Sequence, residues 1–274
     1  MHVPYHTALV TGASSGIGRA LTCWLARRGV EVYALARREA ELCTLRDELA
    51  PEGGTVHPLA MDISDTDALV EQLGELSDAV GGFDLVVANA GISRTTNARK
   101  LHWADVRDTI DVNISGAAAT VTAALPAMVR RGRGHIVGMS SIAGARGLPR
   151  HAAYSASKAF LNTFLEGLRL DLASTNITVT CLQPGFVKTP LVASSNFKMP
   201  FMLEVEAAVE QIAGAIVRKE RDYSFPRPTA AIMRVADALP NPLYDALGSR
   251  MFGKPKPKGR SSRAASAAEQ TRPS

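Results

Sequence analysis

The sequence contains few cysteines and no long apolar run, and both features exclude classes of protein. Its three cysteines, Cys23, Cys43 and Cys181, are odd in number and share no metal-ligand spacing. Cys23 and Cys181 lie in apolar helix and strand patterns, so we expect reduced thiols packed in the core. No stretch approaches the roughly eighteen uncharged apolar residues of a membrane span. No secretory signal precedes the first strand-like segment, residues 7–10, and a cytoplasmic protein is expected.

The excess of basic residues lies at the C-terminal end of the chain. Lysines and arginines number 31 and acidic residues 26, which gives a formal net charge of +5. Six of these bases and one acid lie from Lys254 onward, and subtracting them leaves 25 of each sign. The sequence therefore predicts a neutral domain, residues 1–253, and a disordered basic tail, residues 254–274. We expect no nucleic-acid binding and, at most, peripheral contact of the tail with an anionic membrane.

Strand-like and helix-like segments alternate along the chain. The strand-like segments are apolar throughout, which is typical of a parallel sheet covered by helices on both faces. Repeated β-α units with right-handed crossovers form a doubly wound sheet. The sequence thus predicts an α/β fold with a doubly wound parallel sheet of Rossmann type, in a single domain. A long helix after the fourth strand is expected to be interrupted near Ser115-Gly116. Six strands are predicted, within residues 8–10, 31–36, 55–60, 84–88, 135–139 and 177–182.

A glycine-rich turn, Thr11 to Gly18, follows the first strand and opens the first helix, as a dinucleotide loop requires. Gly12 permits the tight turn, Gly16 lets the backbone approach a pyrophosphate, and Gly18 lets the helix pack close to the strand. The N–H groups at the helix N-terminus then face the phosphates. A generic βα turn is the alternative, but the placement favours a cofactor loop. Its expected binding residues are Gly12, Ser14, Ser15, Gly16, Ile17 and Gly18.

The end of the second strand predicts which nucleotide is bound. NAD enzymes usually place a carboxylate there, about twenty residues beyond the glycines, to bind the ribose 2′-hydroxyl. This sequence instead has Ala36 followed by Arg37 and Arg38, and a guanidinium is suited to a 2′-phosphate. NADP(H) is therefore the preferred cofactor, with NAD(H) as the second choice. The alternative is that these arginines are solvent-exposed residues at a helix start with no role in binding. Asp62, after the third strand, is expected to meet the adenine or to serve as a helix N-cap.

Tyr154 and Lys158 lie four residues apart, so on a helix their side chains share one face. A phenol beside an ammonium loses its proton more easily than its usual pKa of about 10 allows, which makes it usable as an acid or base. Alone, this spacing is a weak signal, because a surface tyrosine beside a solvated lysine is the commoner case. Its setting adds Ser140-Ser141 at the end of the fifth strand, Asn113 in the preceding helix, and Asn89-Ala90-Gly91 at the end of the fourth strand. Ligands bind at that edge of such sheets.

Together these motifs resemble the short-chain dehydrogenase/reductase superfamily, in its shorter single-domain branch, over roughly residues 5 to 225. The resemblance implies a nicotinamide-dependent oxidoreductase that interconverts a carbonyl and an alcohol on a small-molecule substrate. Tyr154 would be the proton donor in reduction or the base in oxidation. Ser141, which the family's thirteen-residue offset to the tyrosine selects over Ser140, would polarise the carbonyl. Lys158 would bind the nicotinamide ribose and lower the pKa of Tyr154.

The resemblance also assigns a proton relay and further cofactor contacts. Asn113 would support a water that continues the relay. Because Ser15 stands where one subgroup has a basic residue, the preference for NADP rests on Arg37, with Arg38 as support. Beyond the glycine loop and the arginines, the expected cofactor contacts are Asp62, Asn89, Ala90, Gly91, Tyr154, Lys158, Pro184, Gly185, Val187 and Thr189.

The segments after Thr189 bear on substrate and partners. Residues 190–203 are largely apolar, and in the family this region covers the substrate, so a hydrophobic ketone or alcohol is expected; core packing is the alternative. Residues 226–253 carry apolar residues at helix-like intervals. They are predicted to close the active site, rest on a membrane surface or, as preferred, pack in a homodimer or homotetramer. His151 is expected to be an exposed helix-start residue and not the catalytic base.

A rival function from another class remains. A nucleotide-sensing or scaffolding member of the same fold would bind the cofactor without turnover. Such a protein could lose Tyr154, Lys158 or Ser141 freely. The presence of all three in one sequence favours the enzyme.

Overall fold

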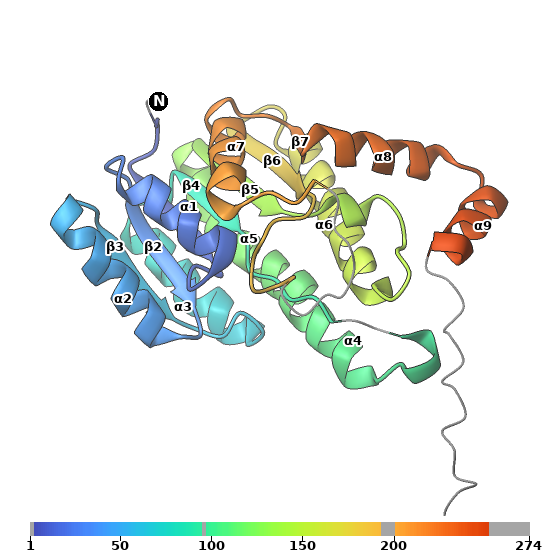
Figure 1. Cartoon of the computed structure of the whole chain (residues 1–274). Coiled ribbons are helices and arrows are strands. Elements are labelled where there is room, and N and C mark those ends of the chain that lie inside the picture. The colour runs from blue at the N-terminus through green and yellow to red at the C-terminus, as the bar shows by residue number, and fades with distance from the viewer. Residues whose placement is uncertain (1–2, 95–96, 193–200, 252–274) are drawn as a thin grey trace, which may run out of the picture. The chain divides into compact units, whose positions relative to one another are not determined.

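Seven parallel strands form the central sheet of the computed structural model, which describes residues 3–94, 97–192 and 201–251 (Figure 1). The order across the sheet is β3-β2-β1-β4-β5-β6-β7. The doubly wound parallel sheet predicted from the sequence is confirmed. The strands are β1 (Thr7–Thr11), β2 (Glu31–Ala36), β3 (Val56–Ala60), β4 (Leu85–Ala88), β5 (Arg133–Met139), β6 (Asn176–Pro184) and β7 (Asp222–Phe225).

The last of these strands, β7, is not predicted from the sequence. It has four residues, Asp-Tyr-Ser-Phe, of which only Phe225 is fully buried. A segment this short and polar carries no apolar run that could mark it as a strand. Its place is set by pairing with β6, from Cys181 opposite Asp222 to Pro184 opposite Phe225.

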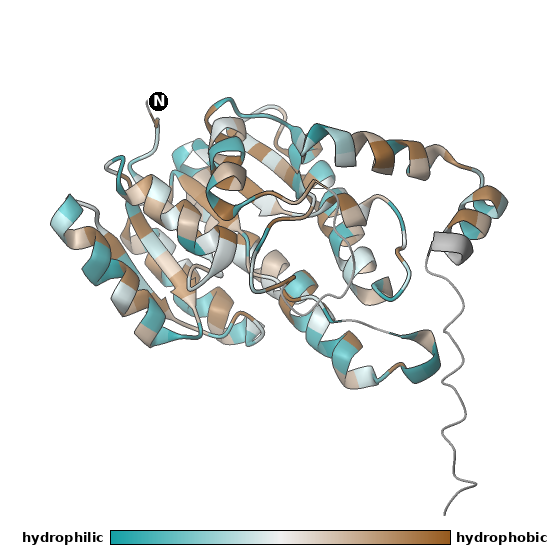
Figure 2. Cartoon of the chain, viewed as in Figure 1, coloured by the Kyte–Doolittle hydropathy of each residue, from teal (hydrophilic) through white to brown (hydrophobic). Residues whose placement is uncertain are grey.

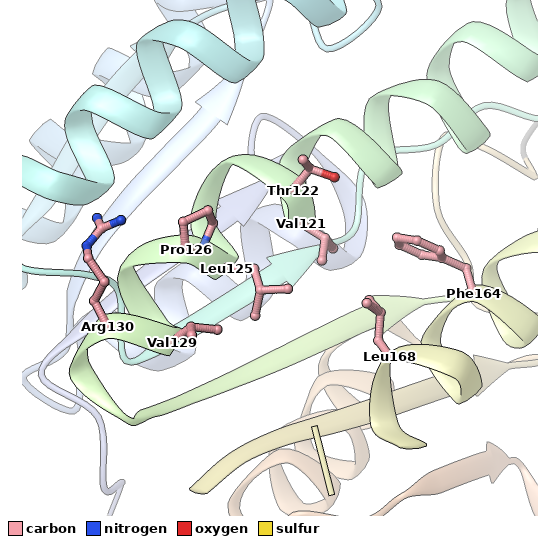
Figure 3. Close-up of a pocket in the computed structure, with 8 residues that line it drawn as sticks. All are labelled: Val121, Thr122, Leu125, Pro126, Val129, Arg130, Phe164 and Leu168. Carbon is pink, nitrogen blue, oxygen red and sulfur yellow. The ribbon is translucent and has the colours of Figure 1, made fainter. Parts of the chain in front are cut away.

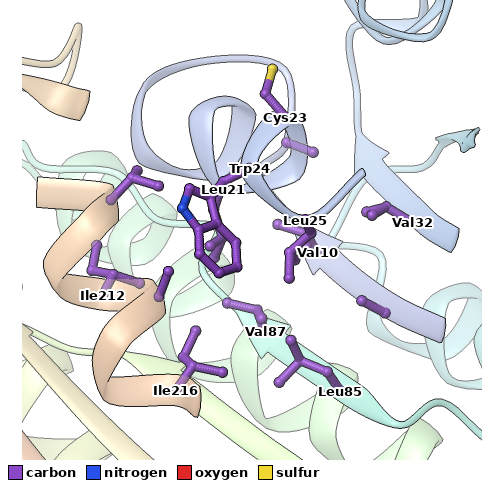
Figure 4. Packing of buried hydrophobic residues seen from close by; sticks show 14 of the residues in the cluster. Val10, Leu21, Cys23, Trp24, Leu25, Val32, Leu85, Val87, Ile212 and Ile216 are labelled. Carbon is purple, nitrogen blue, oxygen red and sulfur yellow. The ribbon is translucent and has the colours of Figure 1, made fainter. Parts of the chain in front are cut away.

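Helices cover both faces of the sheet, and each face has its own hydrophobic cluster. On one face, α1 (Gly16–Ala26), α2 (Glu39–Leu49) and α7 (Val205–Val217) pack over Val10 and Val87 (Figure 4). On the other face, α3 (Thr66–Ala79), α5 (Ala117–Arg131) and α6 (Ala152–Asp171) pack over Leu9 and Val86. Adjacent strand residues therefore serve opposite faces, which explains why the strands are apolar throughout.

The helix between β4 and β5 is continuous but changes type. It runs over 29 residues, Trp103–Arg131, as α4 (Trp103–Ile110), the π-helical turn η3 (Asp111–Gly116) and α5. The interruption predicted near Ser115-Gly116 is thus a local change of helix type and not a break. By length and composition alone this helix could cross a membrane, a candidate that the sequence prediction missed. It packs against α3, β4 and β5, as a core helix does.

The chain divides into two compact units, Met1–Ala238 and Leu239–Ser274. The first unit holds the whole sheet and every helix through α8 (Arg227–Ala238). The second contains α9 (Asn241–Met251). The predicted basic tail, residues 254–274, lies outside the described residues, and a single domain over residues 1–253 stays a prediction.

Candidate active site

The predicted site residues follow the carboxyl ends of six neighbouring strands. The glycine loop follows β1, Arg37 follows β2, Asp62 follows β3, and Asn89 follows β4. Further along the sheet, Ser141 follows β5 and Gly185 follows β6. After β1 the chain builds the sheet outward through β2 and β3, then returns to place β4 on the other side of β1. That reversal is the topological switch point at which open α/β sheets bind ligands.

The glycine loop is packed so closely that side chains are excluded at two positions. A Cβ atom added at Gly18 would lie 2.3 Å from the Gly12 carbonyl oxygen, and one at Gly12 would lie 2.9 Å from Ala90 Cα. Gly12 and Gly16 also adopt left-handed backbone, with φ of 70° and 54°. Gly16 faces Thr189, whose side chain would lie 3.3 Å from an added Cβ. Gly12 therefore allows the tight turn and Gly18 the close packing of helix and strand, while the approach of a pyrophosphate at Gly16 stays a prediction.

Thr11 and Asn89 fasten the glycine loop to the end of β4. The Thr11 hydroxyl accepts hydrogen bonds from the backbone N–H groups of Asn89 and Ala90, both at 3.0 Å. The Asn89 amide donates to the Thr11 carbonyl at 2.8 Å. Two adjacent strand ends are thereby held in fixed register beside the loop. Thr11 has no place among the predicted site residues, although it opens the quoted motif.

The start of α1 is suited to hold an anion. Its first turn carries no acidic side chain, and no side-chain capping hydrogen bond from Ser15 is found among the described residues. The first-turn N–H groups therefore keep their positive partial charge for a ligand, as a bound pyrophosphate requires. Arg38 adds a cation here, since its guanidinium donates to the Ser14 hydroxyl at 2.8 Å. These residues fit a dinucleotide phosphate.

Arg37 and Asp62 lie at the outer part of the site and are paired weakly. The nearest guanidinium nitrogen of Arg37 is 3.9 Å from the Asp62 carboxylate, and the two side chains are 66% and 43% exposed. Burial acts to raise the pKa of Asp62, but hydrogen bonds from Ser64 and the charge of Arg37 outweigh it, so the pKa is lowered. The helix N-cap of α3 is Asp65 and not Asp62.

Asn113, in the π-helical turn, joins the β4 loop to α6. Its side-chain oxygen accepts from the Ile92 N–H at 2.8 Å, and its amide donates to the Ile92 carbonyl at 2.9 Å and to the Ser157 hydroxyl at 3.0 Å. Ser157 in turn donates to the Tyr154 carbonyl at 2.7 Å. Asn113 therefore holds the helix that carries Tyr154. Ser157 was missed as a site residue, although its place inside the Tyr-Ser-Ala-Ser-Lys motif was a signal.

The two serines after β5 have different surroundings. Ser140 is buried, and its hydroxyl oxygen lies 3.1 Å from the Lys158 carbonyl and 2.6 Å from Asn162 Oδ1, either of which can accept its one hydrogen. The Ser141 hydroxyl donates to the Pro184 carbonyl at 3.3 Å and lies close enough to Tyr154 to act on the pKa of the phenol, which it lowers. Ser140 therefore has a structural role, since its contacts are with residues of α6. Ser141 is the serine beside the phenol, as the sequence offset implies.

Lys158 is buried and lies beside Tyr154, but it does not lower the phenol pKa in this structure. Its ammonium donates to the Met139 carbonyl at 2.7 Å and lies 5.7 Å from the centre of the Tyr154 ring. Burial raises the pKa of Tyr154, and the hydrogen bond with Ser141 only partly opposes this rise. Burial also lowers the pKa of Lys158 to about 8. The predicted depression of the phenol pKa by Lys158 is therefore not found here, because burial raises the pKa and the influence that opposes the rise comes from Ser141.

His151 also differs from expectation. It is the N-cap residue of α6 and is partly buried, with its ring 6.4 Å from the Tyr154 ring, edge to face. Its N–H donates to the Leu148 carbonyl at 3.1 Å, which folds the preceding loop against the helix start. Its Nδ1 atom is buried without a hydrogen-bond partner among the described residues. Burial lowers the pKa of this imidazole, so it is neutral at pH 7.

The segment after β6 completes the edge of the site. The Gly185 N–H donates to the Phe225 carbonyl at 2.7 Å, which joins the end of β6 to β7. Val187 is buried and bridges to Leu203, while Thr189 lies against Gly16. Residues 193–200 of the predicted substrate cover lie outside the described residues. Of the cofactor contacts predicted in this segment, Thr189 lies next to the glycine loop.

An apolar groove of about 550 Å³ lies between α5 and α6 (Figure 3). None of the predicted site residues lines it. It is a separate surface feature, lined by Val121, Thr122, Leu125, Pro126, Val129, Arg130, Phe164 and Leu168.

Comparison with known families identifies the fold and its chemistry. Residues 6–199 match the family model for short chain dehydrogenases. This chain belongs to the short-chain dehydrogenase/reductase family. It is 56% identical over 247 residues to an uncharacterized oxidoreductase of Myxococcus xanthus, covering 90% of this chain and 98% of that one. The protein is therefore an oxidoreductase of this family that acts on CH–OH donors with a nicotinamide nucleotide.

Solved structures agree with this assignment. A short-chain dehydrogenase from Sphingobium yanoikuyae, in complex with NADPH, is 25% identical, with a TM-score of 0.76 over 93% of this chain and 98% of that one. An alcohol dehydrogenase from Thermococcus sibiricus, complexed with 5-hydroxy-NADP, is 26% identical, with a TM-score of 0.71 over 80% and 94%. Both neighbours carry NADP-type nucleotides.

Proposed function

We propose that this protein is an NADP(H)-dependent oxidoreductase that interconverts a hydrophobic ketone and its alcohol. One observation carries the proposal. Ser141 and Tyr154 lie next to each other, with Ser141 acting to lower the pKa of the phenol, at the strand edge where the glycine loop and α1 are suited to hold a dinucleotide. Two hydroxyl donors at one point can polarise a single carbonyl oxygen.

Tyr154 is the proton donor in the reductive direction. A bound nicotinamide supplies the hydride to the carbonyl carbon. As the carbonyl oxygen gains electron density, the phenol passes its proton to that oxygen, and an alcohol results. Because burial raises the pKa of Tyr154, the phenol holds its proton at neutral pH until the developing alkoxide takes it. Ser141 donates a hydrogen bond to the same oxygen and so stabilises the charge that develops.

Lys158 and Asn113 support this step. The Lys158 ammonium, anchored on the Met139 carbonyl, is placed to bind the nicotinamide ribose and to stabilise the negative charge that the phenol oxygen gains as it loses its proton. Asn113 is bonded to Ile92 after β4 and to Ser157 on α6. Ser157 in turn contacts the Tyr154 carbonyl, and this arrangement positions the phenol. In the proposed relay a water beside Asn113 returns a proton toward Tyr154.

Arg37 supports the choice of NADP(H), and Arg38 adds positive charge at the glycine loop. Arg37 is exposed at the end of β2, where a 2′-phosphate would lie, and its ion pair with Asp62 is long enough to exchange for a phosphate. Arg38 is held over the glycine loop by Ser14 and by Glu41, 3.3 Å away. The NADP-type nucleotides in two structural neighbours support the same choice.

A hydrophobic substrate is supported by the described residues that flank residues 193–200. Leu191, Phe201 and Met202 are 40%, 54% and 42% exposed. Flexible and aromatic side chains left exposed beside the site can cover an apolar substrate. A homodimer or homotetramer in the cytoplasm is part of the proposal, and the apolar groove between α5 and α6 supports subunit packing.

The test is NADPH oxidation against a panel of aliphatic, aromatic and polycyclic ketones, with sugars as the polar comparison. Tyr154→Phe should reduce turnover at least about 10³-fold, because the proton donor is lost while the ring remains. Tyr223→Phe is the matched control, since among the described residues of the first unit the hydroxyl of Tyr223 hydrogen-bonds only to Gln211. Full activity in Tyr154→Phe contradicts the mechanism, and NADPH binding without turnover of any panel member supports the silent alternative.

A further inference from the structure

Asn162 continues the row of residues on α6 that contains Tyr154 and Lys158. The three residues lie four positions apart, so their side chains share one face of the helix. The proposed reaction uses the first two and gives Asn162 no role. Figure 2 shows that the strands of the sheet are largely apolar, so a polar side chain packed at their ends needs specific partners.

The side-chain oxygen of Asn162 lies among three groups that can donate hydrogen bonds to it. The Ser140 hydroxyl is 2.6 Å from this oxygen, the Cys181 thiol 3.3 Å and the Gln183 amide nitrogen 3.4 Å. Burial raises the pKa of Cys181 to about 11, so the thiol keeps the proton that it donates. The Ser224 hydroxyl donates to the Gln183 amide oxygen at 2.7 Å and so leaves the amide nitrogen for Asn162. One oxygen therefore joins α6 to the ends of β5 and β6.

Two partners of Asn162 are direct sequence neighbours of residues in the active site. Ser140 precedes Ser141, which lies beside the catalytic phenol. Gln183 precedes Pro184, whose carbonyl accepts from the Ser141 hydroxyl at 3.3 Å. A shift at Ser140 therefore moves the Ser141 hydroxyl, and a shift at Gln183 moves the carbonyl that this hydroxyl contacts.

Lys158 is held at both ends by two consecutive residues after β5. Its ammonium donates to the Met139 carbonyl at 2.7 Å, and its backbone carbonyl lies 3.1 Å from the Ser140 hydroxyl. Gly144 packs closely against the same part of the helix. A Cβ atom added there would lie 2.8 Å from Asn162 Nδ2 and 2.8 Å from the Lys158 carbonyl carbon. The turn that follows β5 is thus packed directly against α6.

We infer that Asn162 is a positioning residue for the proposed reaction. Its amide oxygen fixes the ends of β5 and β6 against α6, and so sets the position of the Ser141 hydroxyl relative to the Tyr154 phenol. Asn162 acts through its partners and not on the reacting atoms. The inference rests on the proposed function, in which these two hydroxyls act on one carbonyl oxygen. A displacement of about 1 Å between such groups can lower a rate about 10²-fold.

The test is steady-state kinetics of the full chain carrying Asn162→Leu, which keeps the size of the side chain and removes the acceptor. The substrate is the panel ketone with the highest kcat/KM in the wild type. We expect kcat per bound NADPH to fall about 10- to 100-fold, with KM for the ketone and Kd for NADPH within about threefold of the wild type. Fluorescence titration with NADPH counts the folded molecules, and so separates this loss from a loss of folded protein.

Three further variants complete the experiment. Asn162→Asp is the conservative change, because a carboxylate oxygen accepts from the same three donors, and it should keep kcat per bound NADPH within about threefold of the wild type. Asn176→Leu makes the same substitution as the test variant at an exposed asparagine, at the start of β6, and should change nothing. Ser140→Ala removes the shortest contact of the Asn162 oxygen and should lower kcat per bound NADPH about tenfold.

An unchanged kcat per bound NADPH in Asn162→Leu overturns the inference. If that variant does not fold, Ser140→Ala takes its place, and its full activity has the same meaning. An equal loss in Asn162→Asp also overturns the inference, since the acceptor would then not matter. Each of these results leaves the proposed function intact while Tyr154→Phe is inactive. If the wild type turns over no ketone, the proposed function fails first and the inference fails with it.

Discussion

The two halves of the active site are held by different kinds of contact. At the ends of β2 and β3, Arg37 and Asp62 are 66% and 43% exposed and 3.9 Å apart. Between β4 and α6, Asn113 is 1% exposed, and its three side-chain hydrogen bonds measure 2.8, 2.9 and 3.0 Å. Exposed ion pairs contribute about 0–1 kcal/mol, whereas a buried polar group left without its partner costs about 1–3 kcal/mol.

This difference indicates a division of labour. The nucleotide side of the site, at Arg37 and Asp62, presents exposed charges that can change partners at little cost in free energy. It can therefore select a cofactor without affecting the fold. The catalytic side is fixed by buried hydrogen bonds, so changes there should disturb geometry, rate and stability together. Four predictions test this contrast, in order of decreasing effect.

The largest effect is expected at Lys158. Lys158→Met should reduce turnover about 10³-fold or more, because a buried cation beside the phenol is lost. Since the pKa of Lys158 is lowered to about 8, the ammonium is lost as the pH rises through that value. NADPH affinity, followed by fluorescence, should therefore fall above about pH 8 in the wild type, and Lys158→Met should not show this fall. Lys188→Met, on an exposed lysine, is the control and should match the wild type.

Asn113→Ala should affect both stability and rate. It leaves the Ile92 backbone and the Ser157 hydroxyl without their partner, so we expect a loss of about 2–4 kcal/mol in the free energy of unfolding. Turnover should fall about 10²-fold, because the helix that carries Tyr154 loses its support. Chemical denaturation and steady-state rates measure both effects. The exposed cap residue Asn97, changed to Ala, should alter neither. A stable but inactive Asn113→Ala would show that the amide acts in the reaction and not in positioning.

His135 belongs to a buried hydrogen-bond network away from the active site. Changing it tests whether the loss of a buried polar group affects stability without affecting catalysis. His135 lies between Tyr5 at 2.7 Å and Thr180 at 2.8 Å, and burial lowers its pKa to about 3. Its contribution to stability is complete above the unfolded pKa of about 6.5 and is lost as the pH falls toward 3. Between pH 7 and 5 the loss should be about 2 kcal/mol, because only the unfolded chain takes up the proton.

The measurement is the free energy of unfolding as a function of pH. His135→Gln should lower stability at pH 7 and remove this part of its acid dependence, with the rate per folded molecule unchanged. His6→Gln, on an exposed histidine, keeps the wild-type profile. A parallel loss of activity in folded His135→Gln would mean that buried polar groups affect the reaction wherever they lie.

The smallest effect is expected at the nucleotide side. Arg37→Ala should weaken NADPH about tenfold and leave NADH nearly unchanged, because only the 2′-phosphate needs the guanidinium. Thermal stability should not change, since the side chain is mostly exposed. Arg38→Ala should weaken both nucleotides together, because Arg38 reaches the glycine loop through Ser14. Equal losses of NADPH and NADH in Arg37→Ala would remove Arg37 from the 2′-phosphate role.

Much of the fold could be predicted from the sequence because local patterns encode it. The apolar strands, the glycine loop and the order of elements all depend on neighbouring residues. The strand β7 could not be predicted, because its place depends on pairing with β6, which is distant in the sequence. The π-helical turn at Asn113 was predicted only as an interruption.

The site was predicted less completely, for a related reason. Motif spacing identifies Tyr154 and Lys158, but it does not show that burial raises the pKa of the phenol. The burial of His151 depends on how the preceding loop folds against α6. The hydrogen bond from Asn113 to Ser157 joins residues 44 positions apart. The spacing of motifs in the sequence does not predict properties that depend on such long-range packing.

The most direct test of the division of labour compares kcat/KM with NADPH and with NADH in three proteins. We predict that Tyr154→Phe lowers both values by the same factor, because the phenol serves the reaction whichever nucleotide is bound. Arg37→Ala should lower only the NADPH value, and so change the ratio that Tyr154→Phe leaves unchanged. A changed ratio in Tyr154→Phe, or an unchanged ratio in Arg37→Ala, would contradict the account.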